Sequence, residues 1–337
     1  MELEGKAVVV TGGAGFIGSA LTETLLRLGS RVTVFDSFDD FYNGKEANLD
    51  GVRGHPRLRV VKGDILDRRA LDESLRGTDL VFHLAAQAGV RYCLERPEKA
   101  HEVNATGTFN VLQAARKAKV AKLVYASSSS VYGDPVKVPM DEEHPQRPTS
   151  PYAASKLAGE KYCLAFAESY GMNVVCLRYF SVYGPRGRPD QVVTSFTESV
   201  SRGTPPTIYG DGSAARDFTF IDDVVDATVL SAMVEEASGE TMNIGYGKDV
   251  KIGHVASAIL EHYGSGFRPR FLPTYAGDFP RTICSNARAR RVLGWRPQVS
   301  FEEGLKMYLQ WYDRRLAERA SMHNPPLSGA GAEGGTG

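Results

Sequence analysis

The chain is poor in cysteine and tryptophan, with four and two copies among its 337 residues. The cysteines are Cys93, Cys163, Cys176 and Cys284, and they have none of the paired spacings typical of zinc sites. Isolated thiols of this kind are usually reduced core residues of a cytosolic protein. We therefore predict no metal site, reduced thiols and a cytoplasmic location.

The chain also lacks an excess of charge and any long apolar run. Lys plus Arg and Asp plus Glu each number 40, so the net charge is about zero, which argues against a nucleic-acid surface. No apolar run approaches the roughly 20 residues that span a bilayer, and the acidic residues 1–6 do not resemble a signal peptide. A composition of 42% hydrophobic and 24% charged residues is that of an ordinary globular protein. We expect neither nucleic acid nor membrane as a partner.

What the chain does contain is a regular alternation of apolar runs and helical patterns. The runs lie at 7–10, 31–35, 58–61, 80–84, 122–126, 174–178 and 241–244, and the helical stretches at 19–28, about 67–76, 98–118, 151–170 and 222–233. Alternation at this spacing predicts parallel β-α-β units. The expected fold is therefore α/β, with a Rossmann-like doubly wound parallel sheet.

The rhythm breaks after about residue 180, where Gly, Pro and Arg cluster. We expect a cofactor-binding domain at 1–180, joined by about 214–250, whose helical and strand-like stretches can return to the first sheet. A smaller, discontinuous C-terminal substrate-binding domain is expected over 181–320. The Gly-, Ser- and Pro-rich segment 321–337 predicts a disordered tail.

A glycine-rich turn, Gly12-x-x-Gly15-x-x-Gly18, comes directly after the first strand. Its glycines let the backbone approach a pyrophosphate, and free N–H groups of the next helix stabilise that anion. Asp36 ends the second strand, where a carboxylate accepts both hydroxyls of a ribose and repels a 2′-phosphate. The pattern predicts NAD rather than NADP; the alternative is a tight structural turn with an exposed Asp36.

Residues after the third and fourth strands extend this site. Asp64 and Ile65 are expected to flank the adenine, and the small residues of Leu84-Ala85-Ala86 to pass beneath the nicotinamide ribose.

Tyr152 and Lys156 lie four residues apart on one face of a predicted helix. A free tyrosine has a pKa of about 10, and a nearby ammonium or an oxidised nicotinamide favours the phenolate and lowers that pKa. The serines at 127–130 supply hydroxyls for the substrate oxygen. Such a pair alone is common on amphipathic helices, but beside the glycine turn it predicts hydride chemistry on an alcohol or ketone.

These motifs resemble the extended short-chain dehydrogenase/reductase family, specifically its nucleotide-sugar epimerases and dehydratases, to about residue 315. Further matching segments are Asn104-Ala-Thr-Gly-Thr, Arg216-Asp-Phe-Thr-Phe-Ile-Asp-Asp, Asn243-Ile-Gly and Leu293-Gly-Trp. The resemblance implies that Ser128 is the catalytic hydroxyl, Tyr152 the base and Lys156 its partner. The full set of expected NAD contacts is Gly12, Gly15, Phe16, Ile17, Gly18, Asp36, Asp64, Ile65, Leu84, Ala85, Ala86, Asn104, Ser127, Tyr152, Lys156 and Tyr179.

Branches of this family differ in the residues beside the catalytic hydroxyl. Dehydratases carry an Asp-Glu pair and nucleotide-sugar decarboxylases a Glu, whereas this chain has Ser129 and Ser130. Acid–base chemistry beyond the tyrosine is therefore unsupported. The resemblance then implies a UDP-sugar 4-epimerase, which oxidises C4, reorients the 4-keto sugar and returns the hydride to its other face.

Segments 83–91 and 180–190 look most like UDP-glucuronate 4-epimerases, and Ser181 stands where galactose epimerases usually have Asn. A 4-keto uronic acid is a β-keto acid and loses CO₂ readily if its carboxylate stands perpendicular to the ring carbonyl. Hydrogen bonds from Ser129, Ser130 and Ser181 would hold the carboxylate and suppress that loss.

The resemblance also implies contacts farther out. Arg216 and Arg281 would neutralise the UDP pyrophosphate, Arg188 would contact the nucleotide end, and Arg91 would approach the sugar or anchor its own loop. Tyr209 is expected near the uracil and Asp278 over the ribose. The complete substrate set is Arg91, Ser128, Ser129, Ser130, Ser181, Arg188, Tyr209, Arg216, Asp278 and Arg281.

Several alternatives remain open from the sequence. They are a UDP-glucose or UDP-GlcNAc 4-epimerase, a UDP-glucuronate decarboxylase, a dehydrogenase that exchanges NAD, and a non-catalytic NAD-sensing protein. The intact Ser128, Tyr152 and Lys156 argue against the last. Helical stretches 98–118 and 151–170 resemble the pair that forms a four-helix dimer interface in this family, so a homodimer is expected.

Overall fold

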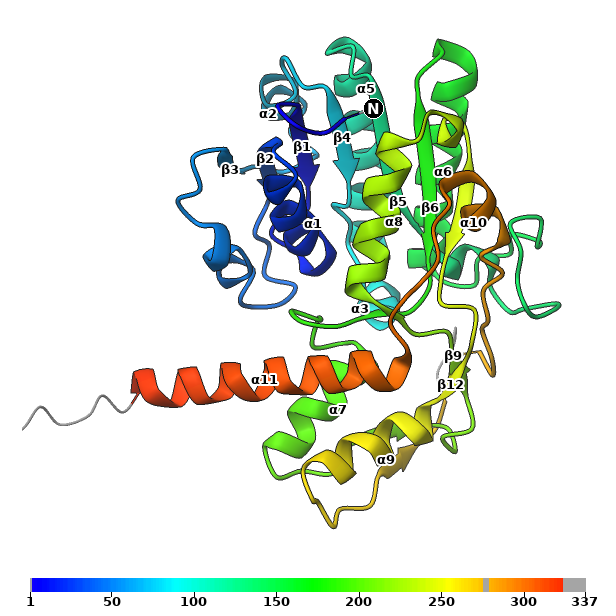
Figure 1. Ribbon diagram of the computed structural model, residues 1–337. Coiled ribbons are helices and arrows are strands. Elements are labelled where there is room, and N and C mark those ends of the chain that lie inside the picture. The colour runs from blue at the N-terminus through cyan, green and yellow to red at the C-terminus, as the bar shows by residue number, and fades with distance from the viewer. Residues whose placement is uncertain (1, 275–278, 324–337) are drawn as a thin grey trace, which may run out of the picture.

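The structure, a computed structural model, describes residues 2–274 and 279–323 and is organised around one parallel sheet (Figure 1). Within those residues the sheet has seven strands in the order β11-β6-β5-β4-β1-β2-β3, and each neighbouring pair is parallel. The strands are β1 (Ala7–Thr11), β2 (Arg31–Asp36), β3 (Leu58–Lys62), β4 (Leu80–His83), β5 (Lys122–Ser128), β6 (Val174–Tyr179) and β11 (Thr241–Ile244). The predicted doubly wound sheet is confirmed, and each predicted strand lies within two residues of its observed limits.

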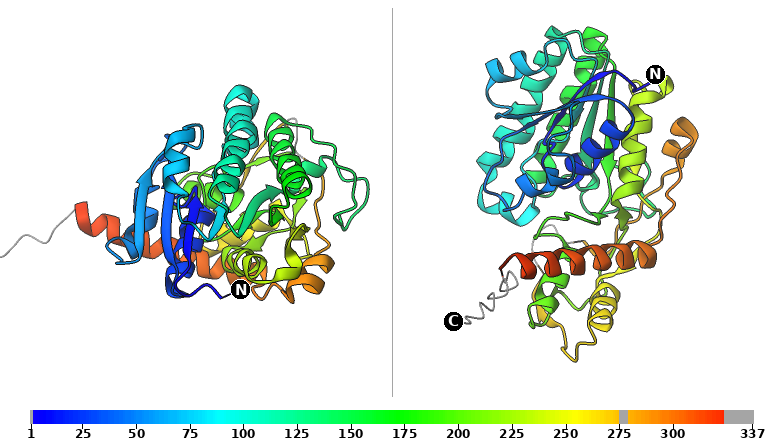
Figure 2. Two further views of the ribbon diagram at one scale, coloured as in Figure 1. Left: turned by 90° about the horizontal axis from the view of Figure 1, so that it is seen from above. Right: turned by 60° about the vertical axis from the view of Figure 1, so that its left-hand side comes forward.

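The strands are buried because helices cover both faces of the sheet (Figure 2). On β1, Val8 and Val10 belong to one core cluster and Val9 to another, as alternation along a strand requires. One face carries α1 (Phe16–Arg27) and α8 (Ile221–Met233), and the other carries α2 (Arg68–Ser74), α5 (Thr108–Lys117) and α6 (Pro151–Tyr170). The chain leaves β1 toward the first face and β4 toward the second. The carboxyl ends of these adjacent strands therefore border a crevice, where ligands bind in folds of this type.

The predicted helix over 98–118 is interrupted in the structure. It consists of α4 (Pro97–His101), one π-helical segment at Glu102–Gly107 and then α5. The wider turn brings Gly107 against Ile65, where an added Cβ would lie 2.4 Å from the Ile65 Cδ1. A continuous apolar pattern could not reveal this local change of pitch.

The remaining chain forms short elements, most of them beneath the sheet in Figure 1. Small strand pairs join β7 (Val182–Tyr183) to β10 (Thr219–Phe220), β9 (Ala215–Arg216) to β12 (Val250–Lys251), and β8 (Thr207–Tyr209) to β13 (Arg270–Leu272). The other helices are α3 (Val90–Glu95), α7 (Val192–Ser201), α9 (Ile252–His262), α10 (Ala287–Leu293) and α11 (Phe301–His323), with single 3-10 segments at Glu46–Val52, Ser129–Tyr132 and Glu235–Ala237.

Helix α11 crosses between the sheet layer and the lobe that contains α7 and α9 (Figure 2). By contrast, α8, β11 and α10 return to the sheet layer. Because α11 ends at His323, residues 321–323 are helical rather than part of a disordered tail, which corrects that expectation. None of the three is Gly or Pro, so nothing in them stops the helix. The rest of the predicted tail lies outside the described residues.

Across residues 2–274 and 279–323, we find no helix long and apolar enough to cross a bilayer. The four cysteines are buried free thiols. No group of three or more potential metal ligands forms in that part of the chain.

Candidate active site at the carboxyl edge of the sheet

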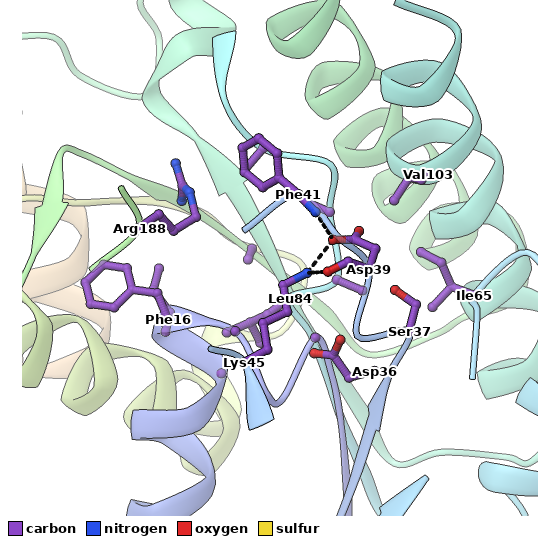
Figure 3. Close-up of a pocket in the computed structure, with 18 of the residues that line it drawn as sticks. Phe16, Asp36, Ser37, Asp39, Phe41, Lys45, Ile65, Leu84, Val103 and Arg188 are labelled. Atoms are coloured by element: carbon purple, nitrogen blue, oxygen red, sulfur yellow. Dashed lines mark hydrogen bonds and ion pairs between the residues drawn. The ribbon is translucent and has the colours of Figure 1, made fainter. Parts of the chain in front are cut away.

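A cavity opens where β1, β2 and β4 end, and every expected cofactor residue except Asn104 lines it. Figure 3 shows Asp36, Ser37 and Ile65 on one side of this cavity and Phe16 and Arg188 on the other. The residues that the sequence did not indicate as its lining are Phe35, Ser37, Asp39, Phe41, Tyr42, Lys45, Gly63, Ala88, Lys99, Val103, Ala126 and, as a cofactor residue, Arg188.

The glycine turn is too tightly packed for other side chains. Gly12 has a φ of +70°, and a Cβ on it would lie 2.7 Å from the Ala85 nitrogen. A Cβ on Gly18 would lie 2.1 Å from the Gly12 carbonyl oxygen. Helix α1 begins with no side-chain cap and no acidic residue in its first turn. Its first amides are thus left for an anion at the cavity, which fits the pyrophosphate of a dinucleotide.

Asp36 lies at the end of β2 and faces the cavity (Figure 3). Its carboxylate accepts hydrogen bonds from the Ala14 amide at 3.0 Å and the Phe38 amide at 2.8 Å. Burial raises the pKa of Asp36, while the two amides oppose that rise. These bonds fix the carboxylate in an orientation suited to accepting ribose hydroxyls, and its charge suits NAD rather than NADP.

The beginning of α6 orients Tyr152 and Lys156. Ser150 caps the helix by accepting from the Ala153 amide at 3.2 Å, and Pro151 occupies the first turn. Tyr152 and Lys156 then reach the same cavity from successive turns. Burial lowers the pKa of Lys156 to about 8, and its ammonium lies 4.4 Å from the centre of the Tyr125 ring.

The environment of Tyr152 differs in one respect from the sequence expectation. Burial raises the pKa of Tyr152, and the positive charge of Arg188 and a hydrogen bond with Ser128 lower it. Arg188 is thus a cation that favours the phenolate, a role that the sequence did not indicate. A residue 36 positions away could not be assigned this effect from a local motif.

Arg188 was expected at the nucleotide end of the substrate, but it lies on the wall of the cofactor cavity. Its Nε and Nη2 donate to the two oxygens of Asp190 at 2.9 and 3.0 Å. The bidentate pair holds the guanidinium beside Tyr152, and both groups come from the loop after β7.

Asn104 is the other departure from expectation, because it does not line the cavity. Its side chain accepts from the Gln87 amide at 2.8 Å and donates to the Gln87 carbonyl and the Ser155 hydroxyl. The π-helical segment turns this amide inward, so that it ties the loop after β4 to α6. Asn104 thus orients two elements that line the cavity.

A buried ion pair supports the cavity wall beside Ser127 and Ser128. Ser127 donates to Glu160 at 2.6 Å, and Glu160 accepts twice from Arg178, at 2.6 and 3.0 Å. Arg178 also donates to the Tyr132 hydroxyl at 2.8 Å, which donates to Asn243 at 2.6 Å. Glu160 and Arg178 are almost fully buried. This network joins β5, β6, α6 and β11. It fixes the carboxyl end of β5, where Ser128 is the last residue of the strand.

The serine run lies beside this edge. The Ser130 hydroxyl donates to the Ser128 oxygen at 2.8 Å, and the Ser130 amide approaches it at 3.2 Å. Ser128 pairs in register with Tyr179 on β6, so Ser181 lies only two residues beyond the neighbouring strand position. The structure thus brings Ser128–Ser130 and Ser181 to one edge.

The expected outer residues form two small groups. Arg91 donates to the Tyr209 hydroxyl at 2.7 Å and stacks 4.5 Å from its ring centre. Arg281 is paired with Asp249 at 2.5 Å, and the bridge between Ala215 and Arg281 brings it next to Arg216. Arg216 donates to the Ala215 carbonyl at 2.9 Å. Asp278 lies outside the described residues.

Sequence reasoning missed the segment immediately after Asp36. Lys45 bonds to the carboxylate and carbonyl of Asp39 (Figure 3), and Phe41 and Tyr42 face the same cavity. The position of this segment in the sequence could have indicated its role. Charged and aromatic residues directly after the carboxyl end of a parallel strand lie at the edge of the sheet where ligands bind.

Comparison with known proteins agrees with this geometry. The model of the NAD dependent epimerase/dehydratase family matches residues 8–245. The chain is 38% identical to a UDP-glucose 4-epimerase of Mycolicibacterium smegmatis, covering 90% of this chain and 97% of that protein. It is 35% identical to a UDP-glucuronate 4-epimerase of Thermodesulfobacterium geofontis, covering 90% and 95%.

Among solved structures, the chain resembles a UDP-glucuronic acid 4-epimerase from Bacillus cereus in complex with UDP-glucuronic acid and NAD. The TM-score is 0.88 at 32% identity, covering 92% of this chain and 99% of that one. The glycine turn, Asp36 and the Tyr152–Lys156 pair line the cavity of this chain. The chain therefore belongs to the NAD dependent epimerase/dehydratase family, with NAD as its cofactor.

Proposed function

We propose that this protein is a UDP-glucuronate 4-epimerase that forms UDP-galacturonate without decarboxylation. The observation that carries the proposal is the neutral, hydroxyl-rich edge around Ser128, to which Ser129, Ser130 and Ser181 belong. Its nearest relatives in activity, dehydratases and decarboxylases, need a carboxylate there.

The carboxylates near the site are otherwise engaged. Among the described residues that line the cavity they are Asp36, Asp39 and Asp64, all at the adenosine end. Asp190 lies close enough to Tyr152 to raise its pKa, but both of its oxygens accept from Arg188. Elimination of water requires an acid and a base besides the tyrosine, and these carboxylates are not available for that work.

The chain's own residues then have defined roles. Tyr152 takes the proton from the O4 hydroxyl, Ser128 hydrogen-bonds the same oxygen, and Lys156 orients the ribose of the cofactor and holds positive charge. NAD supplies the hydride acceptor at C4. After the 4-keto sugar turns over, Tyr152 returns the proton to O4, so no net oxidation occurs.

Retention of the carboxylate is the distinctive requirement. A 4-keto uronic acid loses CO₂ when its carboxylate stands perpendicular to the ring carbonyl, so neutral donors that fix its rotation suppress the loss. Ser129 and Ser181 carry such hydroxyls, and Ser130 supplies a third by turning its proton from Ser128 to the substrate; neutral hydroxyls do not remove the charge of the carboxylate.

The second candidate is a UDP-glucose or UDP-GlcNAc 4-epimerase. It is favoured by the 38% identity to the mycobacterial UDP-glucose enzyme, a closer match than that to the Thermodesulfobacterium protein. The two candidates share the NAD site and Tyr152, and they differ only in what the serine edge binds.

The test is to incubate the purified protein with UDP-glucuronate, UDP-glucose and UDP-GlcNAc separately, without added cofactor, and to resolve the products. UDP-galacturonate formed in preference to the other epimers supports the proposal. A UDP-pentose means decarboxylation, selective turnover of a neutral sugar supports the second candidate, and a stoichiometric demand for NAD means a dehydrogenase.

Tyr152→Phe should lower kcat by a factor of about 10³ or more, because it removes the proton acceptor, while bound NAD remains. Tyr162→Phe is the matched control, since Tyr162 lies on the same helix with its side chain exposed. Equal activity of the two variants would remove Tyr152 as the base.

We also propose a homodimer through α5 and α6. Tyr162 and Tyr170 of α6 are 41% and 54% exposed, and Phe109 of α5 contacts Tyr162 at 5.5 Å between ring centres. Leu112 is fully buried in the core instead. Light scattering after size exclusion should give twice the chain mass, and Tyr170→Glu should reduce it to one.

A further inference from the structure

Tyr42 has a buried hydroxyl whose proton finds no acceptor among the described residues. It lies on the segment after β2 and lines the cofactor cavity. Its oxygen is inaccessible to solvent, and the one group near it that the protein supplies, the Phe16 amide, is a donor and cannot accept its proton. Buried polar atoms are nearly always paired, and leaving one unpaired costs free energy. A phenylalanine would fill the same space without that cost, so the hydroxyl needs another explanation.

The direction in which the Tyr42 hydroxyl points suggests why it is retained. A Cβ added to Gly15 would lie 3.8 Å from the Tyr42 oxygen. Gly15 is the N-cap residue of α1, and a hydrogen bond from the Phe16 backbone amide lowers the pKa of Tyr42. The hydroxyl therefore faces the uncapped amides at the beginning of α1, across the space that the glycine turn keeps open.

The ring is held in that position by its neighbours. Phe41 packs edge-on at 6.0 Å between ring centres, and the Lys45 ammonium lies 5.0 Å from the centre of the Tyr42 ring. Burial raises the pKa of Tyr42 to about 12, although the charge of Arg188 lowers it. The group thus keeps its proton at neutral pH and can act as a donor.

We propose that the Tyr42 hydroxyl donates a hydrogen bond to a pyrophosphate oxygen of bound NAD. The amides of α1 then hold the pyrophosphate from one side and Tyr42 holds it from the other. The ribose hydroxyls of NAD are donors, and Asp36 already accepts from them. A phosphate oxygen is an acceptor, which is the kind of partner that the protonated Tyr42 hydroxyl beside Gly15 needs.

The test is Tyr42→Phe, which keeps the ring and removes the hydroxyl. Binding of NAD, ADP-ribose and adenosine to the nucleotide-free full chain is measured by calorimetry, with competition for the weak ligand. NAD and ADP-ribose, which contain the pyrophosphate, should bind about tenfold or more weakly to the variant. Adenosine, which contains no phosphate, should bind the two proteins equally.

Tyr92→Phe is the matched control. The Tyr92 ring packs 4.8 Å from Phe41, and its hydroxyl accepts from Arg96 at 2.9 Å, but it does not line the cavity. This variant should bind all three ligands as the unmodified protein does.

Stability without nucleotide gives a second readout. Because the Tyr42 proton has no acceptor among the described residues, Tyr42→Phe should melt at about the same temperature as the unmodified chain or higher. Unchanged affinity for NAD, an equal loss for adenosine, or a lower melting temperature of the nucleotide-free variant would each overturn the proposal.

Discussion

The cofactor half and the substrate half of the molecule hold their functional side chains in different ways. Lys156 is 2% exposed and Asp36 7% exposed, and each is fixed by burial and by several neighbours. In the substrate half, the Arg281 side chain is 55% exposed and is held by Asp249. From this difference in burial we expect the first half to hold its side chains in place before any ligand binds, and the second to use surface side chains that exchange partners when a nucleotide sugar binds.

The two halves meet at the loop after β7. Arg186 of that loop bonds Glu23 at 2.5 Å and Ser19 at 3.3 Å, both on α1. Two residues later, Arg188 reaches the cofactor cavity beside Tyr152. The substrate half is thus tied to the helix whose N-terminus faces the cofactor. Four substitutions, at Glu160, Lys156, Gly18 and Arg281, test whether buried side chains hold the cofactor half and exposed side chains the substrate half.

The largest expected effect is on the buried ion pair. Glu160→Gln leaves the Arg178 charge without its partner in the interior, and should lower the free energy of unfolding by about 3–5 kcal/mol. Glu198→Gln breaks a pair with Arg202 on α7, where the Arg202 side chain is 72% exposed, and should cost about 1 kcal/mol or less. Urea unfolding measures both. Equal losses of unfolding free energy in the two variants would contradict the difference between the buried and the exposed ion pair.

A second expectation concerns pH. The pKa of Lys156 is lowered from 10.5 to about 8 by burial. Below pH 8 Lys156 is protonated in both the folded and the unfolded state, and the folded state bears the full cost of burying the charge. Between pH 8 and 10.5 Lys156 binds more protons in the unfolded chain than in the folded one. The free energy of unfolding therefore rises with pH in this range.

The stability advantage of Lys156→Met over the unmodified chain should therefore shrink by up to about 3 kcal/mol from pH 7 to pH 10.5. Urea titrations at several pH values test this. Lys161→Met corrects for loss of a lysine from the same helix. An advantage that does not change with pH would contradict a buried ammonium.

The third expectation compares two glycines. A Cβ on Gly18 would meet the Gly12 carbonyl oxygen at 2.1 Å, whereas one on Gly266 would meet nothing within 4 Å. Gly18→Ala should cost about 1–3 kcal/mol and weaken NAD binding, because the glycine turn must open. Gly266→Ala should change stability by about 0.5 kcal/mol or less. Thermal melting and NAD content of the purified variants provide the readouts, and a tolerated Gly18→Ala would mean that the turn adjusts.

The smallest effect on stability is expected at Arg281. Arg281→Ala should leave the melting temperature unchanged, because the pair with Asp249 is exposed. If Arg281 leaves Asp249 to bind the pyrophosphate of the sugar nucleotide, KM should rise about tenfold with little change in kcat. Arg291→Ala, on the exposed side of α10, is the control. An unchanged KM would exclude Arg281 from substrate binding.

The cofactor half could be predicted because its signals are local. Gly12, Gly15 and Gly18 lie in one turn, and Tyr152 and Lys156 share one helix face. The spacing of these residues in the sequence is therefore enough to predict that they act together. The substrate contacts came from resemblance, because elements such as β8 and β9 acquire their neighbours only through long-range pairing.

The departures also have physical causes. Asn104 was expected at the cofactor from the family resemblance, whereas in the structure it lies in a π-helical segment and its side chain accepts from the Gln87 amide. Arg188 and Tyr42 reach the cavity from loops whose paths depend on packing against residues far away in sequence. No periodicity records such contacts.

The proposed reaction requires a hydride that leaves C4 and returns to the same carbon. The direct measurement is to turn over UDP-glucuronate labelled with deuterium at C4, with no added NAD, and to locate the label in the product by NMR. We predict that the deuterium stays at C4 of UDP-galacturonate, with no net NADH formed. Loss of the label to solvent, its appearance on another carbon, or accumulation of NADH would contradict this reaction.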